Sequence, residues 1–314
     1  MQSFFKPALA LALACAALAP TQAAPLNTSD GLVYRPTGRG HGEIDEAASA
    51  APSQDRLGSQ APITAAVTSN GITFHGGPVM TAATNVYVVW YGSWTAPQKT
   101  IVSAFFQGLS GTPIFNTNTS YYNAARVPVR NVVTLLGQYA DNYSLGKSLS
   151  DANIKTLVSN AITGGWLPKD TNGVYFVLTA PDVLETSGFG SQYCGWHTHG
   201  TIGGADIKYS FVGNPATIAP AGCGVSNPSP NGDGGVDAMT SVIFHELSET
   251  VTDPDLNAWY DSRGNENGDK CAWRFGTTFK TSNGAVANVS FGGRNWKLQQ
   301  NWVNASGGYC ALAY

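Results

Sequence analysis

Apolar positions along the first half of the folded region follow two periods, one typical of buried strands and one typical of amphipathic helices. Near-continuous apolar runs rich in β-branched and aromatic residues predict strands over 85–92, 127–139 and 173–183. Between them, 96–110 and 150–162 carry apolar residues at helical spacing. The order strand, helix, strand, helix, strand predicts βαβ crossovers and a largely parallel or mixed sheet with helices against it.

The second half adds a strand, a long helix and an irregular tail. A further strand is predicted over 207–215, and residues 236–252 place apolar side chains at a period of 3.6, which predicts a helix. From about 271 to 314 the chain alternates and is rich in Gly and Asn, which indicates irregular β structure. The predicted fold is α/β, with a mixed, largely parallel sheet flanked by helices. The helix 236–252 joins this βαβαβ core in an arrangement reminiscent of zincin metalloproteases.

The N-terminal region is predicted to be a secretion signal followed by a linker. Residues 1–24 have a lysine, an apolar run too short to span a bilayer, and small residues before a cleavage site. Residues 25–62 have almost no apolar periodicity, so we expect a disordered linker or pro-segment. Residues 63–314 form one domain by length. The protein is therefore expected to be secreted, with no segment inserted in a membrane.

Four cysteines remain beyond the predicted signal: Cys194, Cys223, Cys271 and Cys310. An even number in an exported chain favours disulfides, and four cysteines allow three pairings. We predict that neighbours pair, Cys194 with Cys223 and Cys271 with Cys310, so that the bonds staple loops. The alternative is a zinc site built from all four thiolates, but it lacks a closely spaced cysteine pair.

Charge and motif content exclude several functional classes. The formal net charge is −3 and no basic run is present, which argues against nucleic acid or an anionic membrane surface as a partner. The sequence contains no GxSxG nucleophile motif, and its glycine cluster at 232–237 lacks the Lys and Ser/Thr of a phosphate-binding loop. We expect a monomer whose substrate, if it has one, is a peptide or a cell-wall polymer.

The segment 245–261 concentrates one histidine and five carboxylates. His245 and Glu249 lie one turn apart on one face of the predicted helix, where they can bind the same ion. Glu246 lies about 100° around the helix, where it can contact a water bound to that ion. Zinc hydrolases with an HExxH motif use this geometry with the glutamate as general base. A carboxylate can replace the second histidine as a Zn²⁺ ligand, although it is more favourable to Mn²⁺ or Ca²⁺.

The third ligand is expected in the segment that follows the helix. Pro254 disfavours helix at Asp253, so that carboxylate is predicted at the negative end of the helix, a position that a cation would stabilise. Glu266 and Asp255 are the other candidates, and spacing separates the three only slightly. Residues 261–269 also have the oxygen-rich, Gly-containing composition of a Ca²⁺ loop, without EF-hand spacing. Zn²⁺ is the expected ion and Ca²⁺ the alternative.

A second candidate group lies at 194–200, where His197 and His199 are two residues apart and would point to the same side of a strand. Either histidine could complete the site on the helix or act as the electrophile opposite Glu246, and His199 is our candidate catalytic residue. The alternative is a disulfide-anchored loop with surface histidines.

The site on the helix also has an interpretation without an ion. HExxE is a loose pattern, and His245 could be a satisfied core histidine with Glu249 on a solvated face. The concentration of acidic residues between 245 and 269 favours the metal interpretation.

Seven stretches between residues 76 and 260 occur in an order that identifies a family: GGPVMT, NVYVVWYGSWTAPQKTIVSAFFQGLS, YSLGKSLSD, VLTAPDV, CGWHTHG, YSFVGNP and GGVDAM. Together they resemble the phosphate-induced protein 1 family, also called EXORDIUM-like proteins. The resemblance implies a secreted protein of the apoplast and cell wall that is linked to growth promotion, and it implies no settled enzymatic activity.

The chain departs from the plant pattern of this family at His245, Glu246 and Glu249, where plant members carry small or uncharged residues. It therefore resembles a microbial branch in which a metal centre is present. Two hypotheses follow. The first is a secreted metallohydrolase, peptidase-like, in which Glu246 activates a metal-bound water. The second is a non-catalytic extracellular protein with a structural metal, because a structural site needs no open coordination position.

Overall fold

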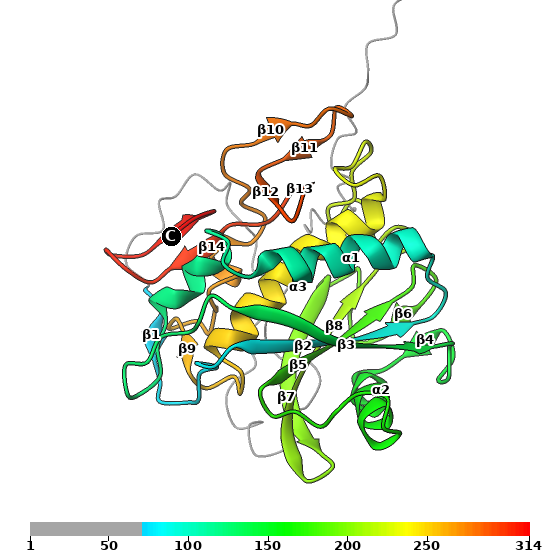
Figure 1. Cartoon of the computed structure of the whole chain (residues 1–314), viewed down its shortest axis with the longest axis horizontal. Coiled ribbons are helices and arrows are strands. Elements are labelled where there is room, and N and C mark those ends of the chain that lie inside the picture. Colours follow the sequence, from blue (N-terminus) through cyan, green and yellow to red (C-terminus); the bar gives the residue numbers. More distant parts are fainter. Residues whose placement is uncertain (1–70) are drawn as a thin grey trace, which may run out of the picture.

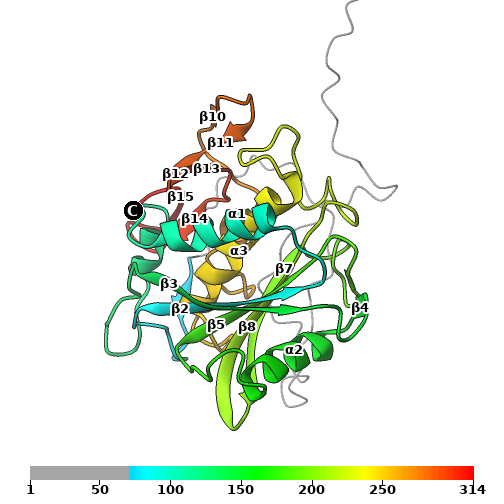
Figure 2. The same ribbon diagram turned by 45° about the vertical axis from the view of Figure 1, so that its right-hand side comes forward.

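The computed structural model describes residues 71–314, and Figures 1 and 2 show a twisted central sheet with helices on both faces. The predicted signal peptide, the segment 25–62 and residues 63–70 of the predicted domain lie outside the described residues. Short C-terminal strands lie on the side of the sheet that carries two of the three α-helices.

The central sheet has five strands in the order β3-β2-β5-β8-β7. β2 pairs in parallel with β3 and β5, and β5 pairs in parallel with β8. β7 forms an antiparallel hairpin with β8 and is an edge strand. These strands are β2 (Thr84–Tyr91), β3 (Val133–Asp141), β5 (Gly173–Thr179), β7 (Gly195–Ile202) and β8 (Ala205–Gly213).

Parallel pairing is concentrated in this central sheet. Among all ladders of the described residues, five are antiparallel and four are parallel. The mixed α/β class is therefore confirmed, whereas largely parallel pairing holds for the central sheet and one two-stranded sheet but not for the described residues as a whole. The remaining strands are β1 (Thr73–Phe74), β4 (Ser148–Leu149), β6 (Leu184–Glu185), β9 (Trp259–Tyr260), β10 (Phe279–Lys280), β11 (Val286–Ala287), β12 (Val289–Phe291), β13 (Arg294–Trp296), β14 (Asn301–Val303) and β15 (Tyr309–Ala311).

The predicted strand over 127–139 begins later than expected, at Val133. Pro128 has no amide hydrogen to donate to a ladder, and it lies instead in an isolated bridge with Tyr122. The strand predicted at 207–215 is β8, which starts at Ala205 because β7 and β8 form a tight hairpin.

Three α-helices cover the sheet, α1 (Ala96–Leu109), α2 (Asp151–Thr163) and α3 (Gly234–Thr252). α1 and α3 lie on one face and α2 on the other (Figure 2). Within residues 71–314, every helix falls short of the length and apolar character needed to cross a bilayer. Two short 3-10 helices complete the set, η1 (Phe115–Ser120) and η2 (Asp269–Cys271).

Side-chain caps fix where the helices begin. Thr95 and Ser150 form capping boxes at the starts of α1 and α2. Asp233 caps α3 by accepting a hydrogen bond from the amide of Val236, so α3 begins at Gly234, two residues before its predicted start.

Helix α3 has no solvent-exposed face. Every residue from Gly235 to Thr252 is buried, because the sheet covers one side and the C-terminal segments cover the other. The polar side of the predicted amphipathic pattern, which includes His245, Glu246 and Glu249, is therefore enclosed. Burying such groups is costly unless each finds a hydrogen bond or a counter-charge.

Both predicted disulfides are present. Cys194 pairs with Cys223, and Cys271 pairs with Cys310. The first ties the start of β7 to the loop before α3, and the second ties the loop after α3 to β15. Both bonds therefore fasten segments that flank α3.

A pair of carboxylates lies at the start of α2. Ser187 Oγ lies 2.6 Å from Asp151 Oδ1 and 3.0 Å from Glu185 Oε2, and Tyr193 donates a hydrogen bond to Glu185. Burial, together with the neighbouring Glu185 carboxylate, raises the pKa of Asp151 to about 7.

This raised pKa predicts a pH-dependent stability. Protonation of Asp151 favours the folded state, so its stabilising contribution is complete below about pH 4 and is lost as the pH rises through about 7. We expect the free energy of unfolding of the wild type, relative to that of Asp151→Asn, to fall between about pH 5 and about pH 8. Urea denaturation of both proteins measures this difference, and a value constant across the range would contradict the prediction.

Candidate metal centre

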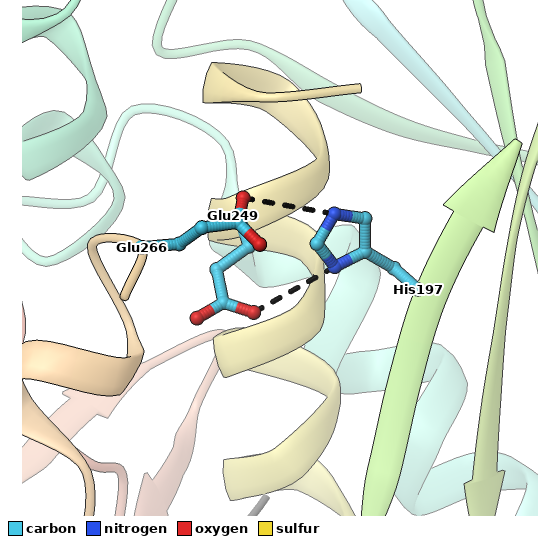
Figure 3. A group of neighbouring side chains, drawn as sticks. All are labelled: His197, Glu249 and Glu266. Carbon is cyan, nitrogen blue, oxygen red and sulfur yellow. Dashed lines mark ion pairs between the residues drawn. The ribbon is translucent and has the colours of Figure 1, made fainter. Parts of the chain in front are cut away.

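Three segments bring polar side chains together in the interior beside α3. His197 comes from β7, Glu246 and Glu249 come from α3, and Glu266 comes from the loop after it. Figure 3 shows the His197 ring beside the Glu249 and Glu266 carboxylates, with one ring nitrogen facing each. We call the full set the interior cluster: His197, His245, Glu246, Glu249, Glu266 and Asp269.

The interior cluster is deeply buried. His197, Glu246 and Glu249 are 0% exposed and Glu266 is 2% exposed. Residues 71–314 contain four glutamates, and three of them are in this cluster. Such a concentration of acid in the interior requires compensation by protons or cations.

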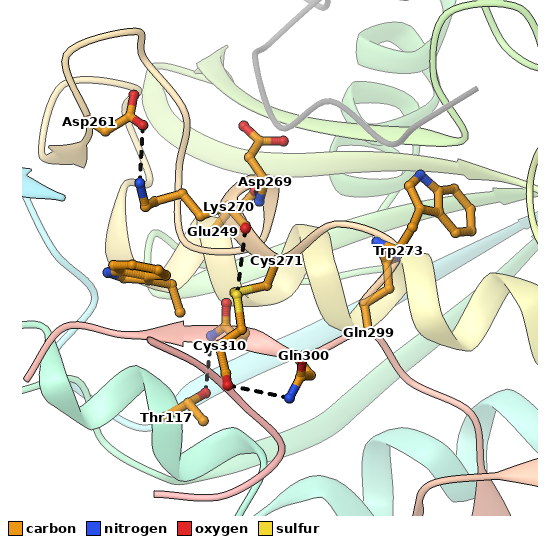
Figure 4. The surroundings of a disulfide bond; sticks show 12 residues. Thr117, Glu249, Asp261, Asp269, Lys270, Cys271, Trp273, Gln299, Gln300 and Cys310 are labelled. Carbon is orange, nitrogen blue, oxygen red and sulfur yellow. Dashed lines mark hydrogen bonds and ion pairs between the residues drawn. A yellow bond between two sulfur atoms is a disulfide. The ribbon is translucent and has the colours of Figure 1, made fainter. Parts of the chain in front are cut away.

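Polar contacts hold the loop after α3 against the helix, and a disulfide ties the end of this loop to β15 (Figure 4). The Asn267 side chain donates to the Ser248 carbonyl at 3.1 Å, and the Asp269 amide donates to Glu249 Oε1 at 2.9 Å. Gly268 packs so closely that a Cβ there would lie 2.8 Å from Glu249 Oε1. The Cys271–Cys310 bond fixes the end of this loop.

The distances around His197 exceed those of hydrogen bonds. Its Nδ1 lies 3.5 Å from Glu246 Oε2 and 3.6 Å from Glu249 Oε2, and its Nε2 lies 3.8 Å from Glu266 Oε1. An N–H···O hydrogen bond measures about 2.7–3.2 Å. Accordingly, His197 Nδ1, both carboxylate oxygens of Glu246 and both of Glu266 have no hydrogen-bond partner.

The two separations at His197 Nδ1 suit side chains that bind one ion through that nitrogen. Ligand atoms about 2.0–2.2 Å from Zn²⁺ in a tetrahedral arrangement lie about 3.3–3.6 Å from one another. His197, Glu249 and Glu266 each offer a ligand atom, and the three atoms lie within 4.8 Å of one another. A nitrogen ligand with carboxylates fits Zn²⁺ or Mn²⁺ better than Ca²⁺, which prefers an all-oxygen shell.

His245 faces the other oxygen of Glu249. Its Nε2 lies 2.9 Å from Glu249 Oε1 and 3.6 Å from Asp269 Oδ1. The contact with Glu249 lacks hydrogen-bond geometry, since neither ring nitrogen of His245 has a hydrogen-bond partner. His245, Glu249 and Asp269 also offer ligand atoms within 4.8 Å of one another.

Protonation within the cluster is strongly perturbed. Burial acts to lower the pKa of His197, but the carboxylates of Glu246 and Glu249 outweigh it and raise that pKa to about 10. Burial raises the pKa of Glu246 to about 7. For Glu249, the neighbouring imidazoles of His245 and His197 outweigh burial and lower the pKa to about 2. A divalent ion can take the place of the protons on the histidines, because a histidine binds metal in its neutral form.

Asp253, one of the predicted third ligands, serves as a backbone cap. Its Oδ1 accepts hydrogen bonds from the amides of Asn257 and Ala258, both at 2.6 Å. The electrostatic conflict expected at the negative end of α3 is thus relieved by two amide dipoles. The Asp253 carbonyl, rather than its carboxylate, faces His197 Nε2 at 3.4 Å.

Asp255 and His199 lie in a separate, partly exposed group. His199 Nδ1 is 2.8 Å from Asp206 Oδ1 and 3.7 Å from Asp255 Oδ1. Lys208 Nζ lies 2.6 Å from Asp255 Oδ1, so this group already contains a cation. The structure therefore does not bring His199 opposite Glu246 or place Asp255 beside His245, and the positions predicted from spacing differ from those observed.

Two members of the interior cluster were not assigned from the sequence. The sequence does not distinguish His197 from His199, because the position of His197 depends on the register of β7 against β8, where it pairs with Ser210. Asp269 was grouped with the acidic segment without a role as a ligand. The two-residue spacing of His197 and His199 was the only signal, and it does not distinguish between them.

Comparison with known proteins finds the same family that the sequence motifs resemble. The chain is 32% identical to Protein EXORDIUM-like 3 of Arabidopsis thaliana over 76% of this chain and 82% of that protein. It is 31% identical to Protein EXORDIUM of Arabidopsis thaliana, over 62% of this chain and 69% of that protein. It is also 31% identical to Protein PHOSPHATE-INDUCED 1 of Nicotiana tabacum, over 60% of this chain and 67% of that protein. No solved structure matches. Because residues 72–299 match the model of the phosphate-induced protein 1 conserved region, the chain belongs to the phosphate-induced protein 1 family.

Proposed function

We propose that this chain is a non-catalytic extracellular protein of the phosphate-induced protein 1 family, in which a divalent metal fastens α3 to β7 and to the loop 261–269. The family assignment and the two disulfides support secretion. The names of its relatives carry no enzymatic activity.

The observation that carries this proposal is the enclosure of the cluster. His197, Glu249 and Glu266 come from three segments, face one another and are almost entirely removed from solvent. A catalytic metal needs an open coordination position and access for substrate, whereas a structural metal is closed by protein ligands. One cavity of the structure is lined by residues that include Trp273, Phe275 and Lys297. It shares no residue with the interior cluster, so it does not give a substrate access to the cluster.

The clamp explains why the cluster contains so much acid. Without an ion, the cluster depends on protons, because burial raises the pKa of Glu246 to about 7 and that of Glu266 well above its usual range, and positive charge reaches the site only on buried, protonated histidines. Binding of Zn²⁺ or Mn²⁺ supplies the missing positive charge and links segments distant in sequence. The binding free energy then contributes directly to folding.

Metal removal is predicted to destabilise the protein. Loading with Zn²⁺ at about one hundred times the dissociation constant stabilises a binding-competent fold by about 2.7 kcal/mol. For a domain of this size that corresponds to an increase in Tm on the order of 5–10 °C over the EDTA-treated protein. Glu249→Gln should lose this metal-dependent increase.

Glu185→Gln is the matched control, because Glu185 is a buried glutamate outside the interior cluster. It should retain the metal-dependent increase in Tm whatever its own stability. Differential scanning calorimetry of the three proteins with EDTA and with Zn²⁺ provides the measurement. Equal Tm values for wild type with and without metal would contradict the clamp.

A secreted metallohydrolase, peptidase-like, is the second candidate function. The observation in its favour is Glu246, whose pKa is raised to about 7 by burial, within the range of a general base. His245 and Glu249 lie one turn apart on a helix packed against a sheet, which is reminiscent of zincins. However, Glu246 Oε2 faces the same nitrogen of His197 as Glu249 does, which suits a ligand better than a base.

Glu246→Gln separates the two functions. If Glu246 is a ligand, Glu246→Gln binds Zn²⁺ at least about tenfold more weakly than wild type, because one contact to the metal is lost. In that case wild type shows no metal-dependent hydrolysis of a fluorogenic peptide library. If Glu246 is a general base, wild type hydrolyses peptides and the variant keeps its metal but loses that activity. Zinc binding by calorimetry and a peptidase assay on both proteins give the answer.

A further inference from the structure

Glu249 lies between two histidines, and each of its carboxylate oxygens faces a different one. Oε1 lies 2.9 Å from His245 Nε2, and Oε2 lies 3.6 Å from His197 Nδ1. The loop after α3 supplies a further carboxylate to each side, Glu266 near His197 and Asp269 near His245. The interior cluster is thus two groups that share Glu249.

The His245 side, like the His197 side, has at least one buried ring nitrogen without a hydrogen-bond partner. Both ring nitrogens of His245 are buried and have no hydrogen-bond partner, although the residue is only 1% exposed. An imidazole in this state is costly unless something binds it. With Glu249 and Asp269, it presents three ligand atoms within 4.8 Å of one another.

We propose that the interior cluster holds two divalent cations, one on the His197 side and one on the His245 side, bridged by the carboxylate of Glu249. This inference rests on the proposed metal clamp and extends it from one ion to two. Protein sites with two divalent ions commonly space them about 3.5–4 Å apart, a distance that one carboxylate can bridge. Glu249 Oε1 also accepts the Asp269 amide, which fixes the orientation of the carboxylate.

Charge supports two ions over one. Glu246, Glu249, Glu266 and Asp269 bring four negative charges when ionised, and the nearby lysines are paired with other carboxylates, Lys208 with Asp255 and Lys270 with Asp261. With both histidines neutral and all four carboxylates ionised, one divalent ion leaves two negative charges uncompensated in a buried site. Two divalent ions with neutral histidines compensate all four, and buried charges are tolerated when paired in this way.

The count of bound metal tests this inference. The full-length secreted protein is stripped with a chelator, dialysed against Zn²⁺, freed of excess metal and analysed by plasma mass spectrometry. We expect two ions per chain in wild type and one in each of His197→Gln and His245→Gln. His199→Gln, from the same strand but outside the cluster, is the control and should retain two.

The outcomes separate the two proposals. One ion in wild type overturns the second site and leaves the clamp intact. No ion in wild type overturns both. If a histidine variant fails to fold, loading wild type with Mn²⁺ gives an independent readout: two bridged ions produce an exchange-coupled electron paramagnetic resonance spectrum, whereas the six-line spectrum of an isolated Mn²⁺ would contradict the inference.

Discussion

The structure depends on how α3 accommodates ionisable groups that no solvent reaches. Glu246 and Glu249 lie on a helix that is buried on every side, and Glu266 joins them from the following loop. The separations around His197, which are too long for hydrogen bonds, support the proposal that a metal compensates these charges. Without that compensation, desolvation and mutual repulsion would oppose the packing of α3 against the sheet.

The surrounding fold is arranged to hold this cluster closed. β7 is the antiparallel edge strand of the sheet, and it presents His197 towards α3. On the other side, the Cys271–Cys310 bond and the Asn267 side chain fix the loop that carries Glu266. Gly268 allows that loop to approach the helix, since a side chain there would meet Glu249 and His245. This enclosure supports the proposal of structural binding over turnover of a substrate.

Sequence patterns predicted the features that depend on local geometry. Helix periodicity placed His245 and Glu249 on one face of α3, and the even cysteine count with neighbour pairing predicted both disulfides. The assignment of His199 as the functional histidine rested on spacing alone. The register of β7 against β8 decides which histidine reaches α3, and that is a tertiary property.

The expected third ligands differed for a similar reason. The predicted helix end suggested Asp253 and the offset from His245 suggested Asp255, but in the turn after α3, where Leu256 adopts a φ of 58°, these carboxylates have other partners. Asp253 caps the amides of that turn, and Asp255 pairs with Lys208 of β8. Glu266, predicted from its distance along the chain, is the candidate of the three whose carboxylate faces His197.

Anomalous diffraction at the zinc absorption edge, from crystals of the Zn²⁺-loaded protein, tests the central claim most directly. The account predicts an anomalous peak enclosed by His197, Glu249 and Glu266, with the ligand atoms drawn to bonding distance. A map without a peak there, in which ordered water or direct hydrogen bonds satisfy these side chains, would contradict it.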